Sequence, residues 1–348
     1  MNTLNHKLSI KYISGLLVLF CMTFFSTGCH DIEDYQDNPR GNFDALWSII
    51  EEHYCFLDEK GLDWDGVYNQ YAPKISDKMT REELFSVCAD MLSLLKDGHT
   101  NLSSPWETSY YRKWWSDYPQ NYDARIIEEY YFNFNYRQVG ALKYGILPQG
   151  NIGYICYPSF ATVIGEGNLD YILAYLATCD GLIIDIRDNG GGNMDMVDRI
   201  ASRFITERIT AGFMIHKTGP GKNEFSEPFE YFIDPAPQGR IMWDKPVAIL
   251  TNRSTFSAAN NFVSVMQYIP QVKIVGARTG GGSGMPFSSE LPCGWSVRFS
   301  ACSVLDARGN TTEFGIDPSP GCAVDMDPVD TFNGHDTILD FAINLLCQ

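Results

Sequence analysis

The stretch Leu182-Ile-Ile-Asp-Ile-Arg-Asp-Asn-Gly-Gly-Gly192 decides the fold class, because a largely apolar run ends in a polar turn with three glycines. Such a run, bounded by turn residues, is typical of a strand that is buried on both faces. Residues 193–205 then carry apolar side chains at helical spacing. The stretch therefore predicts a strand, a glycine turn and a helix, which is the repeating unit of an α/β domain.

The same alternation continues on both sides of this stretch. We expect strands over 152–157, 181–186, 246–250 and 272–275, and helices over 168–178, 193–205 and 255–268. Apolar strands that alternate with helices indicate a largely parallel sheet with helices on both faces. Residues 151–348 are therefore predicted to form an α/β domain.

The chain before residue 151 has a different pattern. From Asn42 onwards, apolar side chains recur at helical spacing, at Phe43, Leu46, Trp47, Ile50 and Tyr54. A second helix is predicted to begin at Thr80, where Glu83 completes a capping box, and to stop near Gly98. We expect a small helical domain over residues 42–105. Residues 106–150 are rich in Trp and Tyr without periodicity, which indicates a connecting segment with a few strands.

Composition excludes some classes of protein. The chain has 348 residues, of which 45% are hydrophobic, so it can form a core and is not a disordered chain. Its length suggests two domains. Its 43 acidic and 26 basic residues give a net charge of −17. Nucleic-acid binding needs a basic face, so we do not expect a nucleic-acid partner.

The amino terminus indicates export. Lys7 and Lys11 precede an apolar run over residues 13–25, which is shorter than the roughly 20 residues that a membrane-spanning helix needs. The run ends in Ser26-Thr-Gly-Cys29, which resembles a bacterial lipobox. We expect a signal peptide over residues 1–28, a lipidated Cys29 and an acidic tether over residues 29–41. Ordinary signal cleavage or an uncleaved anchor is the alternative.

The acidic residues after Cys29 also resemble the export signal of some Gram-negative lipoproteins, which favours the periplasm or the outer-membrane surface. Eight of the ten cysteines would remain as thiols or disulfides in the mature chain. An oxidising compartment permits disulfides, but Cys88, Cys156 and Cys347 lie in apolar runs that favour buried thiols. The sequence has no Cys-x-x-Cys pair, so we expect no structural zinc site.

Four segments contain residues suited to chemistry. The glycines after Asn189 can point backbone N–H groups into a crevice, where they would bind a phosphate or a developing oxyanion. The turn lacks the Lys-Ser/Thr pair of a P-loop and the spacing of a dinucleotide site. A plain strand-to-helix turn is the alternative.

The segment Thr251-Asn-Arg-Ser-Thr-Phe-Ser-Ala-Ala-Asn260 is a second strand-to-helix turn. A serine in the first helical turn lies near the positive end of the helix dipole, and the following N–H can stabilise an oxyanion. Ser254 and Ser257 are both candidate nucleophiles on this ground. A helix cap is the alternative role for either serine.

The segment Lys96-Asp-Gly-His-Thr100 supplies a candidate base. The histidines beyond the predicted lipidation site are His30, His53, His99, His216 and His335. Among them, His99 alone lies in a glycine-flanked turn that can direct an imidazole into a cleft, although a structural histidine is the alternative. Glu313, in Gly309-Asn-Thr-Thr-Glu-Phe-Gly-Ile-Asp-Pro318, is a candidate carboxylate or a solvated residue at a hairpin tip.

These segments, taken in order, resemble one family. The C-terminal processing (tail-specific) serine peptidases show the same succession as Asp97-Gly-His-Thr100, Asp185-Ile-Arg-Asp-Asn-Gly-Gly-Gly192, Thr255-Phe-Ser-Ala-Ala259, Gly276-Ala-Arg-Thr279 and Glu313-Phe-Gly-Ile-Asp-Pro318. The resemblance extends from about Asn42 to the end of the chain. It implies a ClpP/crotonase-like α/β core and hydrolysis of peptide bonds, and it places the nucleophile at Ser257.

The resemblance also selects the base. Many members pair the serine with a lysine, but Gly282 stands where that lysine would fall, and Lys273 lies in a predicted strand. The tricorn-like branch uses a His base and a Glu instead. The resemblance to this branch implies that His99 is the base and that Glu313 orients it directly or through a water.

The expected oxyanion hole consists of the backbone N–H groups of Ala258 and of Gly190 or Gly191. Tail-specific peptidases commonly carry a PDZ domain between the helical part and the core. Residues 106–150 are too few for one and lack a carboxylate-binding Gly-Leu-Gly loop, so binding of a free peptide C-terminus is not expected. The aromatic segment is a candidate wall of the substrate cleft.

The sequence therefore predicts a lipid-anchored serine endopeptidase of the Gram-negative cell envelope, which acts on peptides or unfolded proteins without a metal or other cofactor. A catalytically inactive peptide- or glycan-binding lipoprotein on the same scaffold is the alternative, because Asn260 replaces the Glu that usually follows Ser-Ala-Ala. Acyl-CoA chemistry of the crotonase type does not fit an exported protein.

Overall fold

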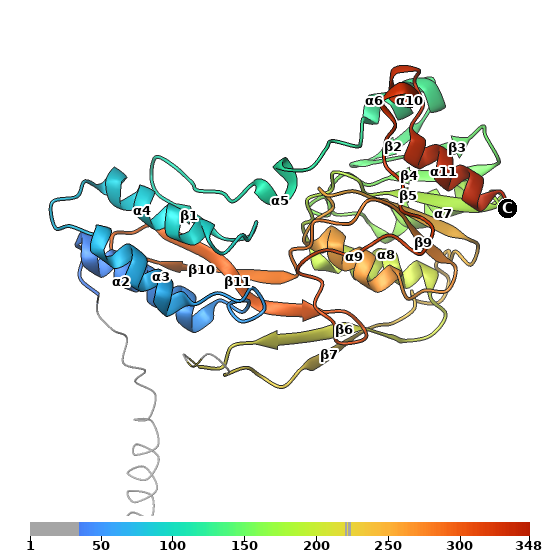
Figure 1. The fold of residues 1–348 in the computed structure, drawn as a ribbon. Coiled ribbons are helices and arrows are strands. Elements are labelled where there is room, and N and C mark those ends of the chain that lie inside the picture. The colour runs from blue at the N-terminus through green and yellow to red at the C-terminus, as the bar shows by residue number, and fades with distance from the viewer. Residues whose placement is uncertain (1–34, 220, 222–223) are drawn as a thin grey trace, which may run out of the picture.

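The computed structural model describes residues 35–219, 221 and 224–348 and has two lobes (Figure 1). A helical lobe contains the first described residues, and an α/β core contains the C-terminus. The expected signal peptide over residues 1–28 and the lipidation site Cys29 lie outside the described residues.

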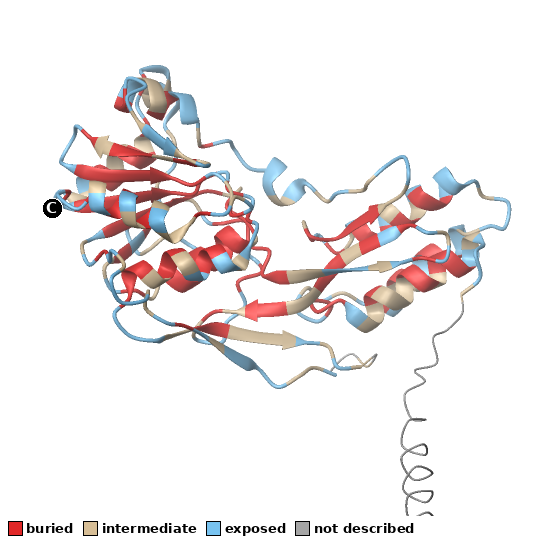
Figure 2. Cartoon of the chain, turned by 180° about the vertical axis from the view of Figure 1, so that it is seen from behind, coloured by how far each residue is buried: buried red, intermediate tan, exposed pale blue. Residues whose placement is uncertain are grey.

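A six-stranded sheet forms the centre of the α/β core, in the order β2-β3-β4-β5-β8-β9. Its strands are β2 (Arg137–Val139), β3 (Leu142–Leu147), β4 (Ile152–Cys156), β5 (Gly181–Asp185), β8 (Val247–Thr251) and β9 (Val272–Gly276). β4, β5, β8 and β9 run parallel, as predicted, whereas β2 and β3 pair antiparallel at one edge. Every residue of β4, β5 and β8 is buried (Figure 2), which explains why these strands are continuous apolar runs.

Helices cover both faces of this sheet. The helices α7 (Glu166–Tyr175), α8 (Met194–Ala201) and α9 (Ala258–Met266) pack on one face. The opposite face is covered by α6 (Ala124–Ile126), by the π-helical turn Ile127–Tyr131 and by α11 (Thr337–Leu346). Shorter elements are the 3₁₀ turns Ala72–Lys74 and Ser202–Phe204 and the helix α10 (Pro328–Phe332). The predicted α/β architecture is confirmed.

The sequence did not predict a second, antiparallel sheet. It contains β1 (Asn101–Ser103), β6 (Ile209–His216), β7 (Phe229–Ile233), β10 (Gly284–Glu290) and β11 (Ser296–Leu305). β11 pairs with β10 along one side and with β1 and β6 along the other. The hairpin of β10 and β11 extends from the core to the helical lobe and joins the two (Figure 1).

The helical lobe contains α2 (Pro39–His53), α3 (Trp64–Tyr71) and α4 (Arg81–Ser93). Its hydrophobic core is completed by side chains from the β10–β11 hairpin, namely Leu291, Trp295, Val297 and Phe299. The helical region expected over residues 42–105 therefore packs around a hairpin that lies two hundred positions later in the chain. We use the term helical lobe for α2 to α4, β1 and this part of the hairpin.

Several expected boundaries differ from the structure, among them those of α2, α4 and α9. α2 begins at Pro39, inside the expected tether, because the side chain of Asn38 caps the helix by accepting from Gly41 N. α4 has the expected capping box of Thr80 and Glu83 but ends at Ser93, before the expected stop at Gly98. α9 begins three residues later than expected, at Ala258.

The segment between β1 and α6 crosses from the helical lobe to the core (Figure 1). It includes the short helix α5 (Lys113–Ser116) and several exposed rings, among them Trp106, Trp115 and Tyr118. This crossing segment is the first part of the connecting segment expected over residues 106–150. The later part forms α6, the π-helical turn, β2 and β3.

The eight cysteines in the described part of the chain are all free thiols. Cys88 and Cys156 are buried, as expected, but Cys347 is exposed because α11 ends just before it at the chain terminus. Within the described ranges, none of the helices combines the length and the apolar character that crossing a membrane requires.

Candidate active site

Ser257 lies directly before α9, where β8 leads into the helix. Its φ of 58° is rare for a residue with a side chain, and its N–H donates to Gly281 O at 2.9 Å. Its side chain makes no capping hydrogen bond to α9. Ser254 lies in the preceding turn, where its N–H donates to the Asn252 side chain.

His99 meets Ser257 across the boundary between the lobes. The His99 Nε2 atom lies 2.9 Å from Ser257 Oγ, although 158 positions separate the two residues. The loop that carries His99 follows Lys96, whose φ of 47° reverses the chain after α4. The Asp97 side chain then fixes the loop by accepting from His99 N at 2.7 Å. The structure therefore brings together Ser257, and not Ser254, with the predicted base.

The environment of His99 keeps its imidazole neutral. The side chain is 4% exposed, and burial lowers the pKa of His99 to about 4, although the nearby charge of Asp97 opposes this shift. A neutral imidazole can accept a proton at neutral pH, which is what a general base must do. Nε2 faces the serine, and Nδ1 is buried without a hydrogen-bond partner among the described residues.

Glu313 does not orient His99 by a hydrogen bond, which corrects the direct link allowed by the sequence analysis. Its carboxylate is buried and lies 2.9 Å from Lys60 Nζ, while its other oxygen accepts from Ser283 N at 2.9 Å. The carboxylate whose charge acts on His99 belongs to Asp97, in the same loop as the histidine. The sequence analysis assigned no role to Lys60 or Asp97.

Burial, and next the charge of Asp97, raise the pKa of Glu313 to about 7, against the opposing effect of Lys60. Burial alone would also raise the pKa of Asp97, but the charges of Lys60 and His99 and two hydrogen bonds hold it below its ordinary value. Lys60 therefore lies between two buried carboxylates that would otherwise repel each other.

Two of the three expected oxyanion donors remain available. Among the described residues, the N–H groups of Ala258 and Gly190 have no hydrogen-bond partner. Gly191 N donates to the Asn189 side chain at 2.9 Å, so this N–H is not a free donor, which corrects the alternative that included it. Gly191 is still required for space, since a Cβ there would lie 2.7 Å from Ser257 Cβ.

No side chain fits at the position where a Ser–Lys pair would have its lysine. Gly282 has a φ of 74°, and a Cβ at this position would overlap the ring of Phe256. Lys273 is exposed on β9, where its charge acts on Cys322. Neither position offers a base to Ser257, which agrees with the expectation that His99 takes this role.

An aromatic stack covers His99. The ring of Phe256 packs against the imidazole with centroids 4.8 Å apart, and Trp114 stacks on Phe256 with centroids 4.1 Å apart. Trp114 belongs to α5 in the crossing segment, so this segment packs beside the catalytic pair, whereas its role as a wall of the substrate cleft stays a prediction. The fit depends on Gly98, where a Cβ would lie 2.6 Å from Trp114 Nε1.

Asn260, one turn into α9, is fully buried and holds the loop that carries Glu313. Its Oδ1 accepts from Thr279 Oγ1 at 2.6 Å, and its Nδ2 donates to Thr312 O at 3.2 Å. The residue is therefore a structural link between the nucleophile helix and the Glu313 loop. In the described part of the chain, no group of three or more His, Cys, Asp or Glu side chains is placed to hold a metal ion.

Comparisons with known proteins place the chain in a family. The model of peptidase family S41 matches residues 151–319, and the model of the tricorn protease C1 domain matches residues 35–93. A solved structure from Parabacteroides merdae ATCC 43184, assigned as a candidate peptidase, is 49% identical over 90% of this chain and 98% of its own, with a TM-score of 0.85. The chain belongs to peptidase family S41.

The chain is also similar to a curated protein and to a further solved fold. Tricorn protease of Thermoplasma acidophilum is 26% identical over 203 residues, which are 58% of this S41 chain and 17% of the relative. The fold of mature CPAF has a TM-score of 0.65 at 12% identity, over 89% of this chain and 96% of that one. The S41 chain spans about a fifth of the length of the curated relatives it matches.

Membership of family S41 makes the chain an enzyme of the serine peptidase class, as the sequence motifs predicted. The sequence motifs located Ser257 and His99 in this S41 site but missed Lys60 and Asp97. Asp97 was visible as the first residue of the Asp-Gly-His-Thr motif. Lys60 lies in the polar run Asp58-Glu-Lys-Gly61, which resembles a solvated turn, so the sequence carried no signal for it.

Proposed function

We propose that this S41 chain is a serine endopeptidase in which Ser257 attacks the scissile carbonyl and His99 acts as general base and then as general acid. The observation that carries the proposal is the 2.9 Å separation of Ser257 Oγ and His99 Nε2. This separation lies within the range in which a base can remove the proton of a nucleophile.

In the first step, the Ser257 hydroxyl transfers its proton to His99 Nε2 while Oγ bonds to the substrate carbonyl carbon. The carbonyl oxygen becomes an oxyanion that accepts from the N–H groups of Ala258 and Gly190. The helix dipole of α9 adds positive potential at the same point. The imidazolium that forms is stabilised by the buried charge of Asp97.

In the second step, the imidazolium gives its proton to the leaving amine nitrogen, the C–N bond breaks, and an ester to Ser257 remains. A water molecule then gives a proton to His99 and attacks the ester, and His99 returns this proton to Ser257 Oγ. The products are a new carboxylate and a new amine, and the enzyme is regenerated.

The substrates that fit this site are peptides and unfolded proteins. Bound substrate would lie against Trp114, the half-buried outer ring of the stack on Phe256, which offers an apolar surface beside the reacting atoms. The proposal also includes anchoring by a lipid on Cys29 and a location in the cell envelope. The support for these two parts is the sequence of residues 1–41.

Replacement of the two catalytic residues tests the proposal. We expect Ser257→Ala and His99→Ala each to lower the hydrolysis of unfolded protein and peptides by at least about 100-fold, because each removes one partner of the proton transfer. Ser254→Ala and His53→Ala are matched controls that should leave the rate within about twofold of wild type. Circular dichroism of each variant checks that the fold is intact.

Full activity in Ser257→Ala or His99→Ala would refute the mechanism. Absence of hydrolysis in the wild-type protein, combined with saturable binding of peptides or glycans, would favour the inactive binding lipoprotein instead.

A further inference from the structure

Lys60 is a buried lysine that the reaction described above does not use. It lies in the turn after α2, with its side chain 8% exposed. Its Nζ lies 2.9 Å from Glu313 Oε1 and 3.9 Å from Asp97 Oδ2. The aromatic rings of Tyr54 and Phe56 pack around it, with Nζ 5.6 and 5.5 Å from their centroids. Lysine is rarely buried without a specific partner, so these contacts call for an explanation.

On the side of the core, Lys60 is linked to the nucleophile through Glu313. The second carboxylate oxygen of Glu313 accepts from Ser283 N at 2.9 Å, and its backbone carbonyl accepts from Gly282 N at 3.2 Å. The neighbouring carbonyl of Gly281 accepts from Ser257 N at 2.9 Å. The Glu313 loop therefore holds the same turn that fixes the conformation of the nucleophile.

On the side of the helical lobe, Lys60 is linked to the base through Asp97. One oxygen of the Asp97 carboxylate accepts from His99 N at 2.7 Å, and the other accepts from Ser300 Oγ at 2.8 Å and faces Lys60. The carboxylate therefore supports the backbone of the histidine and at the same time contacts the lysine.

We propose that Lys60 is a positioning residue for the peptidase reaction. It contacts both Asp97, which supports His99, and Glu313, whose loop supports Ser257, and so it holds the two catalytic residues at the right separation. The inference rests on the proposed function. It explains why a lysine is buried at the boundary between the lobes, and why Glu313 pairs with this lysine and not with the imidazole.

The pair is sensitive to pH because both partners are buried. Glu313 faces Lys60, Asp97, Tyr54 and Cys55, and burial raises its pKa to about 7. His99 faces Asp97 and Lys60, and also Arg298 on β11. Above pH 7 the Glu313 carboxylate is charged and the ion pair is formed, whereas below pH 7 the carboxyl takes a proton and the ion pair is lost. The rate should therefore fall as the pH falls through about 7.

Lys60→Met removes the charge and keeps most of the side-chain volume. We expect kcat at pH 7.5 to fall by about 100-fold with KM within about threefold, since misplacement of a catalytic pair by about 1 Å costs this much. Without Lys60 the pKa of Glu313 rises further, so the acid limb of the profile of kcat/KM against pH should move to higher pH. Lys60→Arg, which keeps the charge, should recover at least part of kcat and restore the acid limb to near pH 7.

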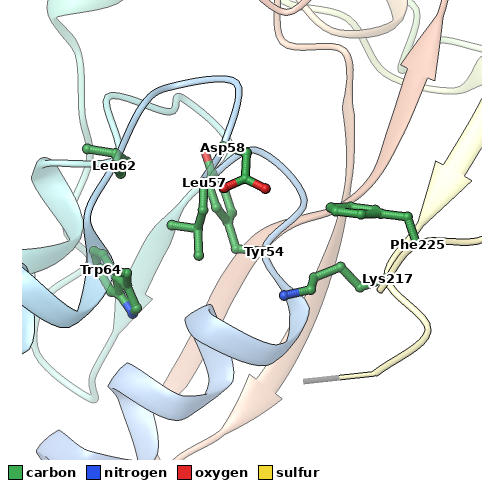
Figure 3. A pocket seen from close by; sticks show the side chains of 7 residues that line it. All are labelled: Tyr54, Leu57, Asp58, Leu62, Trp64, Lys217 and Phe225. Atoms are coloured by element: carbon green, nitrogen blue, oxygen red, sulfur yellow. The ribbon is translucent and has the colours of Figure 1, made fainter. Parts of the chain in front are cut away.

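Lys217 supplies the matched control. It also links the core to the helical lobe, because its Nζ donates to Glu51 O at 2.6 Å in the narrow pocket that Figure 3 shows between Tyr54, Trp64 and Phe225. It contacts neither Glu313 nor Asp97. Lys217→Met should therefore keep kcat within about twofold of wild type, with an unchanged acid limb.

A second variant covers the case in which Lys60→Met does not fold, since an unpaired buried carboxylate is destabilising. Lys60→Met combined with Glu313→Gln removes both charges of the 2.9 Å ion pair and leaves Asp97 with its hydrogen bonds from His99 N and Ser300 Oγ. This variant should fold, retain a low kcat and show no acid limb near pH 7.

The inference would be overturned if Lys60→Met had the kcat and the acid limb of the wild type. It would also be overturned if Lys217→Met lost as much kcat as Lys60→Met, or if the double variant kept the acid limb near pH 7. If the wild-type protein itself hydrolyses no peptide, the proposed function fails and the inference fails with it. An active wild type with an unaffected Lys60→Met overturns the inference alone.

Discussion

Ser257 combines two properties that a helix N-terminus does not give to every serine. Its φ of 58° directs Oγ toward His99, and the N–H of the next residue, Ala258, is left without a partner in the described part of the chain. A backbone conformation of this kind costs on the order of 1–3 kcal/mol in a residue that has a Cβ atom. The surrounding bonds, above all the one from Ser257 N to Gly281 O, must hold the residue in it.

This strain predicts a difference between two inactive variants. Ser257→Gly should be more stable than Ser257→Ala by about 1 kcal/mol, because glycine adopts a positive φ without a steric penalty whereas alanine keeps the Cβ atom. Urea unfolding followed by circular dichroism measures the difference. Equal midpoints for the two variants, with equal slopes, would show that the turn is not strained.

At the scale of single residues, the sequence predicted catalytic roles where the neighbouring residues form a recognisable motif. His99 was found because its turn contains Gly98, and Ser257 was chosen over Ser254 only through the family resemblance. Asp97 was visible in the motif of His99, but its contacts with Lys60 and Ser300 were not, and Lys60 was missed because its role depends on the distant Glu313. Pairing over such separations leaves no local pattern in a single sequence.

The elements around the site come from both lobes, and α5 touches both. Trp114 in α5 fits against Gly98 in the helical lobe and against Phe256 and Gly280 in the core. Arg253 adds a second attachment by donating to Trp114 O. Trp114 is thus one of the residues that fix the crossing segment, although the rings on either side of it are exposed.

Trp114→Ala is therefore expected to weaken the site. It removes the stack on Phe256 and with it the packing that supports the His99 ring, so kcat/KM should fall by about tenfold or more. The same change should expose residues 106–118 to limited proteolysis by an added protease. Trp115→Ala, at the next position and 41% exposed, is the control that should change neither measurement. Equal effects of the two substitutions would contradict this role for Trp114.

The sequence predicted the parallel strands better than the antiparallel ones, for a physical reason. β4, β5 and β8 are buried along their whole length, so each is an unbroken apolar run. β10 is largely exposed and contains Gly, Pro and Ser, so its composition resembles that of a loop. β7 is also largely exposed, although most of its residues are aromatic or apolar. The second sheet was missed because its central strand β11 pairs with β1 and β6, which lie far from it in the chain, and because its exposed strands are not continuous apolar runs.

At the scale of the whole molecule, the base and the nucleophile come from different lobes. The helical lobe supplies His99 from the loop after α4, and the core supplies Ser257 from the turn before α9. The β10–β11 hairpin belongs to both lobes, since its strands leave the core and its far end completes the core of the helical lobe. The catalytic pair therefore depends on the assembly of the two lobes, which no single segment of sequence specifies.

The site and rate of labelling by a fluorophosphonate probe test this account most directly, because the probe reacts with a serine that a base has activated. The account predicts one adduct, on Ser257 by peptide mapping, and a labelling rate that falls by at least about 100-fold in His99→Ala but not in Ser254→Ala. An adduct on Ser254, no adduct at all, or an equal rate of labelling of Ser257 in His99→Ala would contradict it.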